Sequence, residues 1–91
     1  MQFSGKILKH GQVVLDPVHG TLAQIALPNG RAGWRGEFAL LAGQSIRAGM
    51  HELALDDGRS GNIIVNSILV AQGQPTTVLF KGSGALQRAP R

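Results

Sequence analysis

Two arginines, each placed just after a copy of the same turn motif, are the first candidates for chemistry in this chain. Residues 25–33 read IALPNGRAG and residues 53–61 read LALDDGRSG, so that five of nine positions are identical and Arg31 is equivalent to Arg59. A guanidinium group binds phosphate or carboxylate through parallel hydrogen bonds, and two converging guanidinium groups make a paired anion site. We expect such a site if the two hairpins lie next to one another.

A third arginine, Arg35, lies one residue from Trp34. The candidate binding residues are therefore Arg31, Arg35 and Arg59. The alternative is that each arginine is a solvated charge near a turn, with Arg59 making a weak cross-strand ion pair with Asp56. We predict that Trp34 belongs to the core, because the hairpin register places it on the apolar face.

The histidines and serines do not form a recognisable catalytic or metal-binding pattern. His10, His19 and His51 occur in three different segments, and no two have a spacing that places two ligands on one surface. The serines lack the strand–turn–helix elbow of a hydrolase nucleophile and have no recognisable partner. The chain has no cysteine, which excludes disulfides and thiolate metal sites. We predict no catalytic residue, no metal and no cofactor, and a protein that is not an enzyme.

The charge of the chain is only modestly basic once its distribution is considered. The formal net charge is +4 at pH 7, but Arg88 and Arg91 lie in the last four residues and the rest carries a net charge of +2. One tryptophan, three phenylalanines and no tyrosine leave few rings on which bases could stack. Nucleic-acid binding through surface arginines is therefore an alternative function and not the leading one.

The N-terminal segment and the apolar runs argue against a membrane protein. Residues 1–6 lack the charged start and the long apolar stretch of a signal peptide. The longest apolar run, 63–70, is interrupted by Asn66 and Ser67, well below the ~18 residues that a membrane span needs. We expect a soluble cytoplasmic protein with no membrane partner.

The elements that position these residues are short strands. Thirteen glycines and four prolines leave little room for a helix in 91 residues, and apolar segments at 8–12-residue spacing are typical of a sandwich or barrel. We predict an all-β fold, a compact antiparallel barrel or two-sheet sandwich of about seven short strands built from hairpins. Residues 1–82 form the single domain, and 83–91 form a loose basic C-terminal tail. The predicted strands are 2–8, 12–15, 21–27, 31–40, 50–55, 60–70 and 76–81.

The two repeated turns are expected to be hairpin turns, because Asn-Gly and Asp-Gly supply the positive φ that tight turns need. For 53–61, a three-residue loop ending at Gly58 separates apolar from polar residues cleanly. For 25–33, a two-residue loop places residues 25 and 27 on the face of Trp34, whereas Pro28 favours a three-residue loop. A bulge near Gly33 or Gly36 would reconcile the two.

Three classes of function remain open from the sequence. The leading one is a non-enzymatic module that binds a protein partner or itself, as a homo-oligomer, because long apolar strands need their edges and outer faces covered. Ile64 and Leu69 are expected to face away from the core and could contact a second sheet or subunit. A nucleic-acid-binding barrel is the second class and an enzyme the third.

Overall fold

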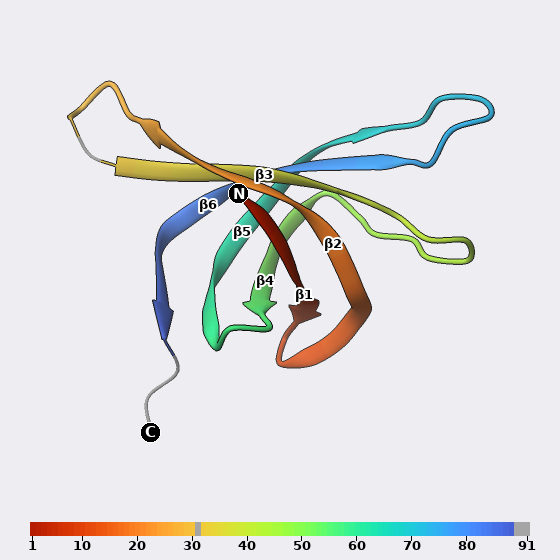
Figure 1. Cartoon of the computed structure of the whole chain (residues 1–91), viewed down its shortest axis with the longest axis horizontal. Helices are drawn as coiled ribbons and strands as arrows, with labels where there is room; N and C mark the ends of the chain where they lie inside the picture. Colours follow the sequence, from red (N-terminus) through yellow and green to blue (C-terminus); the bar gives the residue numbers. More distant parts are fainter. Residues whose placement is uncertain (31, 89–91) are drawn as a thin grey trace.

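The computed structural model describes residues 1–30 and 32–88, and within them six strands form a closed antiparallel barrel (Figure 1). Around the barrel the order is β1-β2-β3-β6-β5-β4, and β4 closes the sheet by pairing with β1. The all-β class is confirmed, and closure selects the barrel over the sandwich. The strands are β1 (Gln2–Lys9), β2 (Gln12–Ala26), β3 (Ala32–Ala39), β4 (Gly49–Leu55), β5 (Arg59–Leu69) and β6 (Thr77–Arg88).

The count of about seven strands becomes six because the second and third predicted strands are one. β2 continues through Asp16 and Pro17, which lie between the predicted strands 12–15 and 21–27. Both lie opposite Lys6 of β1, since the pairing passes from Gly5↔Val18 to Ile7↔Leu15. This is a β-bulge, a position where a strand tolerates proline because no ladder hydrogen bond is required of it.

The C-terminal tail expected from residue 83 onward is also corrected. Residues 83–88 continue β6 and pair with β5 through Asn62↔Ser83 and Ser60↔Gln87. Three residues of β6, 84–86, lie opposite Gly61 alone, so a special bulge of three residues against one accommodates the glycine-rich segment within the strand. Residues 89–91, the rest of the predicted tail, lie outside the described residues.

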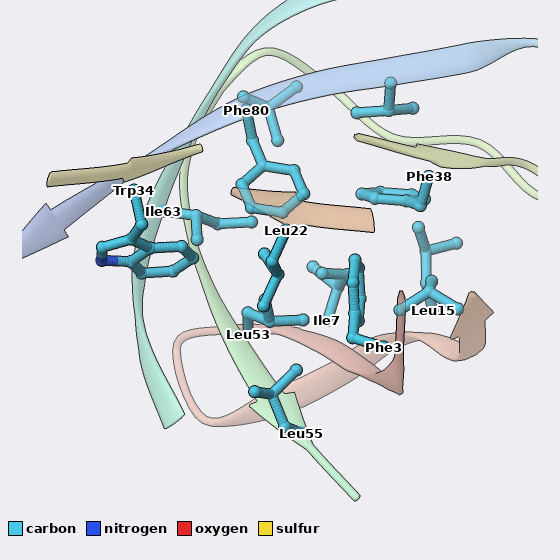
Figure 2. Close-up of a cluster of buried hydrophobic side chains, with 13 residues drawn as sticks. Phe3, Ile7, Leu15, Leu22, Trp34, Phe38, Leu53, Leu55, Ile63 and Phe80 are labelled. Atoms are coloured by element: carbon cyan, nitrogen blue, oxygen red, sulfur yellow. The ribbon is translucent and has the colours of Figure 1, made fainter. Parts of the chain in front are cut away.

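The core contains apolar side chains from all six strands (Figure 2). Phe80 lies at its centre: the centroid of its ring is 6.2 Å from that of Phe3 and 6.0 Å from those of Trp34 and Phe38. Burying each large apolar side chain contributes about 1.5–3 kcal/mol relative to exposure. The buried apolar residues are Phe3, Ile7, Leu15, Val18, Leu22, Trp34, Phe38, Leu53, Leu55, Ile63, Val65, Val78 and Phe80.

The register predicted for the second hairpin is confirmed. Ala54 pairs with Ser60, which leaves the three-residue loop 56–58, and Gly58 has a φ of 94° and donates its N–H to Leu55 O at 3.1 Å. Leu53 and Leu55 consequently lie buried on the same face as Ile63 and Val65. The alternation of apolar and polar residues was sufficient to predict this register, because one face is clearly apolar and the other clearly polar.

The first hairpin has the same register, which decides between the two loop lengths that the sequence left open. Ala26 pairs with Ala32, so the loop is again three residues, 28–30, as Pro28 favours. The pairing of β2 with β3 continues without a shift, so there is no bulge near Gly33 or Gly36. As a result Leu22 shares the inner face with Trp34 and Phe38, and Ile25 points outward.

The two hairpins are not neighbours in the barrel. β6 separates them on one side and β1 on the other. Because β2 and β4 are both antiparallel to β1, the turns that follow them lie at the same end of the barrel. The last residues of β6, which is antiparallel to β3 and β5, reach the same end. We call this end the mouth.

Within the described part of the chain, no helix is long and apolar enough to cross a membrane.

Candidate functional site

The mouth is open because β3 and β6 stop pairing before either strand ends. Their pairing extends from Ala39↔Thr77 only to Arg35↔Lys81. Beyond that point the strands separate: residues 32–34 continue along β2, whereas β6 bends away and follows β5 (Figure 1). A cleft of about 820 Å³ lies between them. We call it the mouth cleft.

The walls of the mouth cleft come from the first hairpin, the end of β6 and the start of β5. Leu22, Gln24 and Leu27 belong to the first wall, Leu86 belongs to β6, and Arg59 belongs to β5. No aspartate, glutamate, histidine or serine is among the described residues that line it. The lining is thus mainly apolar with one guanidinium group at its rim.

Trp34 anchors the cleft and is held rigidly. Its side chain is 8% exposed, which confirms the prediction that it belongs to the core, and its ring packs edge-to-face on Phe80 (Figure 2). The indole Nε1 donates a 2.7 Å hydrogen bond to Gly84 O in the bulge of β6. A Cβ at Gly82 would overlap the indole ring, and one at Gly61 would lie 3.3 Å from Cζ2. The indole ring therefore packs against the backbone of two glycines, Gly61 and Gly82, which leave room for it because they have no side chain.

Arg59 lies at the rim of the mouth cleft and its position is set by Asp57. Asp57 Oδ2 accepts hydrogen bonds from Arg59 Nε at 2.9 Å and forms an ion pair with Nη2 at 2.8 Å, and Oδ1 accepts the Arg59 backbone N–H at 3.0 Å. The cross-strand pair expected with Asp56 is therefore replaced by a contact within the turn. Arg59 also pairs in register with Arg88, so two arginine positions meet at this rim.

The two candidate arginines that the structure describes, Arg35 and Arg59, lie in different places. Arg35 is exposed on the outer face of β3, directly opposite Lys81 of β6, in a separate groove of about 590 Å³. Arg59 lines the mouth cleft instead. Arg31 lies outside the described residues.

Sequence reasoning missed one pair of reactive side chains. Ser4 Oγ and His19 Nδ1 are 2.8 Å apart, because β1 and β2 place these residues directly opposite each other. Only the β1–β2 pairing, with its bulge at 16–17, reveals the contact. The pair lies in a shallow groove away from the mouth cleft.

The two remaining histidines are His10 and His51. His51 is buried in β4, and its Nδ1 is hydrogen-bonded to Gly49 O at 3.1 Å. His10 is exposed in the turn between β1 and β2. Among the described residues no three His, Asp or Glu side chains are grouped so that they could hold a metal ion.

Comparison with known proteins does not extend this description, since no protein-family model, curated protein or solved structure matches the chain. The fold and the cleft define a small closed antiparallel barrel that is open at one end. Its function is therefore argued from the geometry of the mouth cleft.

Proposed function

We propose that this protein is a non-enzymatic cytoplasmic binding module that holds a segment of a protein partner in the mouth cleft. The observation that carries the proposal is the separation of β3 from β6, which leaves an open cleft of about 820 Å³ beside a fixed tryptophan. Tryptophan residues fixed in well-packed pockets are enriched among the residues that dominate protein–protein binding energy. Trp34 is packed in the core and presents its 8% exposed edge at the base of the cleft, with Leu22 and Leu86 lining the same cleft.

The chemistry of the lining supports binding over catalysis. A general base or nucleophile must lie within hydrogen-bond reach of the bound substrate. The described lining offers amide, guanidinium and apolar groups, and the terminal amino group of Met1 donates a hydrogen bond to Leu22 O at 3.0 Å. The Ser4–His19 pair lies in a different groove. Apolar contacts with a few polar groups that fix orientation are typical of a recognition site.

A selection experiment tests this function. Random twelve-residue peptides are displayed and selected on the purified chain, and binding is then measured by the fluorescence of Trp34, the single tryptophan in a chain without tyrosine. We expect selected peptides to shift Trp34 emission. They should lose at least tenfold in affinity against Ala85→Phe, which fills the cleft from an exposed position.

The matched control is Ala42→Phe, in the loop between β3 and β4 at the opposite end of the barrel. It adds the same side chain at an exposed site and should leave affinity unchanged. The proposal is refuted if no peptide is selected, or if the selected peptides bind Ala85→Phe as well as they bind the unmodified chain.

Nucleic-acid binding on the outer face is a second candidate, and one observation favours it. Arg35 and Lys81 lie directly opposite each other on β3 and β6, an arrangement that destabilises a sheet unless an anion offsets it. Glu37 lines the same groove and offsets part of this charge, and phosphate groups would supply further anions. The test is a salt titration of binding to mixed oligonucleotides, in which phosphate contacts give a steep decrease in affinity with salt that Arg35→Ala reduces. No binding at low salt would remove this candidate.

A further inference from the structure

We infer that the partner segment enters the mouth cleft as an extended strand and adds to the edge of β3. This inference rests on the proposed function and specifies the conformation and charge of the ligand. The partner is an acidic, extended peptide segment with apolar side chains at alternate positions. Its backbone pairs with residues 32–34, and its apolar side chains lie against Trp34 and Leu86.

The edge of β3 is formed in advance and is free on one side. Pairing with β2 extends to Ala32, so residues 32–34 already have strand geometry. Pairing with β6 ends at Arg35, so within the described residues this segment has no strand on its other side. Successive residues of a strand direct their N–H and C=O groups to alternate sides, so residues 32–34 present unpaired groups to the cleft.

The residues along both diverging strands are small enough for a third backbone to approach. Ala32 and Gly33 line the cleft on β3, and Gly82, Gly84 and Ala85 line it on β6. None of these five residues carries a side-chain atom beyond Cβ, and the indole of Trp34, which reaches from β3 to Gly84 O, forms the base of the cleft. An apolar cleft with small residues and without a free edge would suit a compact ligand. The unpaired edge is what favours a strand.

Charge distinguishes an acidic partner from a second copy of the chain. The chain has a formal net charge of +4 at pH 7, and a second copy would bring the same charge to the interface. The cationic groups that line the cleft are the terminal ammonium of Met1 and Arg59, the latter ion-paired with Asp57, and no carboxylate is among the described residues of the lining. Complementary charge therefore selects a segment rich in Asp or Glu.

The test is an N-methyl scan of one selected peptide that binds the unmodified chain and not Ala85→Phe. Each peptide N–H is replaced in turn by N–CH₃, and affinity is measured by calorimetry and by Trp34 fluorescence. We expect a loss of tenfold or more at one or two positions of the same parity, because three edge residues offer few hydrogen bonds. Positions of the other parity in the same stretch should change less than twofold.

Two outcomes overturn the inference and leave the proposed function intact. One is a flat N-methyl scan while binding still depends on the cleft, because the backbone then makes no ladder. The other is a set of selected peptides with neutral or basic net charge, which removes the acidic partner. Failure of the selection itself removes both the function and the inference.

Discussion

The packing of the Trp34 ring against Gly82 predicts the effect of adding a side chain at this glycine. In an ordinary strand position, Gly→Ala stabilises a protein by about 0.4–1 kcal/mol, because it restricts the unfolded chain. At Gly82 the added Cβ would overlap the indole ring of Trp34, so the ring must move. Gly82→Ala should therefore destabilise the protein, with a sign opposite to the usual one.

The size of the effect follows from what the ring loses. Displacing it breaks the 2.7 Å hydrogen bond to Gly84 O, worth about 1 kcal/mol, and disturbs the edge-to-face contact with Phe80, worth about 0.5–1.5 kcal/mol. Overpacking of a filled core adds about 1–3 kcal/mol. Set against the gain of about 0.4–1 kcal/mol through the unfolded chain, these costs give a net loss of about 3 kcal/mol, a large share of the 5–15 kcal/mol typical of a domain.

Urea unfolding followed by far-UV circular dichroism measures this loss. With a slope of about 1 kcal/mol per molar urea, as for the smallest domains, the midpoint should fall by about 3 M. Gly33→Ala is the matched control, since the three atoms nearest to its Cβ would all belong to the exposed side chain of Leu27, at 3.1–3.3 Å. Its unfolding free energy should not fall by more than about 0.5 kcal/mol.

A double-mutant cycle assigns the cost of Gly82→Ala to the indole. In the Trp34→Phe background the smaller ring no longer occupies the space above residue 82, so most of the cost should disappear. The reasoning is refuted if Gly82→Ala unfolds at the same urea concentration as the unmodified chain. It is also refuted if the cost is the same with Phe at position 34.

Two further predictions concern the turn and self-association. Asp57→Ala should lower the unfolding free energy by about 0.5–1 kcal/mol, because it removes the Asx turn and an exposed ion pair. Asp57→Asn keeps the oxygen that accepts the turn hydrogen bond and should lose less than half of that. Equal losses for the two variants in thermal unfolding would contradict this account. Light scattering tests the predicted homo-oligomer, whose molecular mass should rise with protein concentration. Leu69→Asn replaces an apolar side chain that is 53% exposed and should lower that mass. A strict monomer at high concentration would exclude self-association.

Sequence patterns that span only a few residues determined the positions of the two hairpin turns and the register of the second hairpin. The Asx-Gly pairs placed both turns, because a left-handed backbone at a hairpin tip strongly favours glycine, and Gly30 and Gly58 have positive φ. The second hairpin's register followed from Leu53, Leu55 and Ile63, because one wrong step would have exposed all of them. The first hairpin resisted the same test, because its tip extends beyond the core and Gln24 lies exposed on the inner face.

Only the tertiary structure decided how distant strands meet. The pairing of β1 with β4 closes the barrel, β2 continues through Pro17, and β6 continues past its glycines; each depends on a neighbour far along the chain. The same pairings place Ser4 beside His19 and Arg35 away from Arg59.

The mouth cleft belongs to this second group. The sequence by itself determined an all-β chain with two turns that each carry an arginine, because turn chemistry and alternation act over a few residues. The tertiary structure decided that β3 and β6 separate beyond Arg35 and that Trp34 lies on Gly82 at the base of the opening. The physical reason is that an unpaired edge exists only where two strands distant in sequence stop matching, which no local pattern encodes.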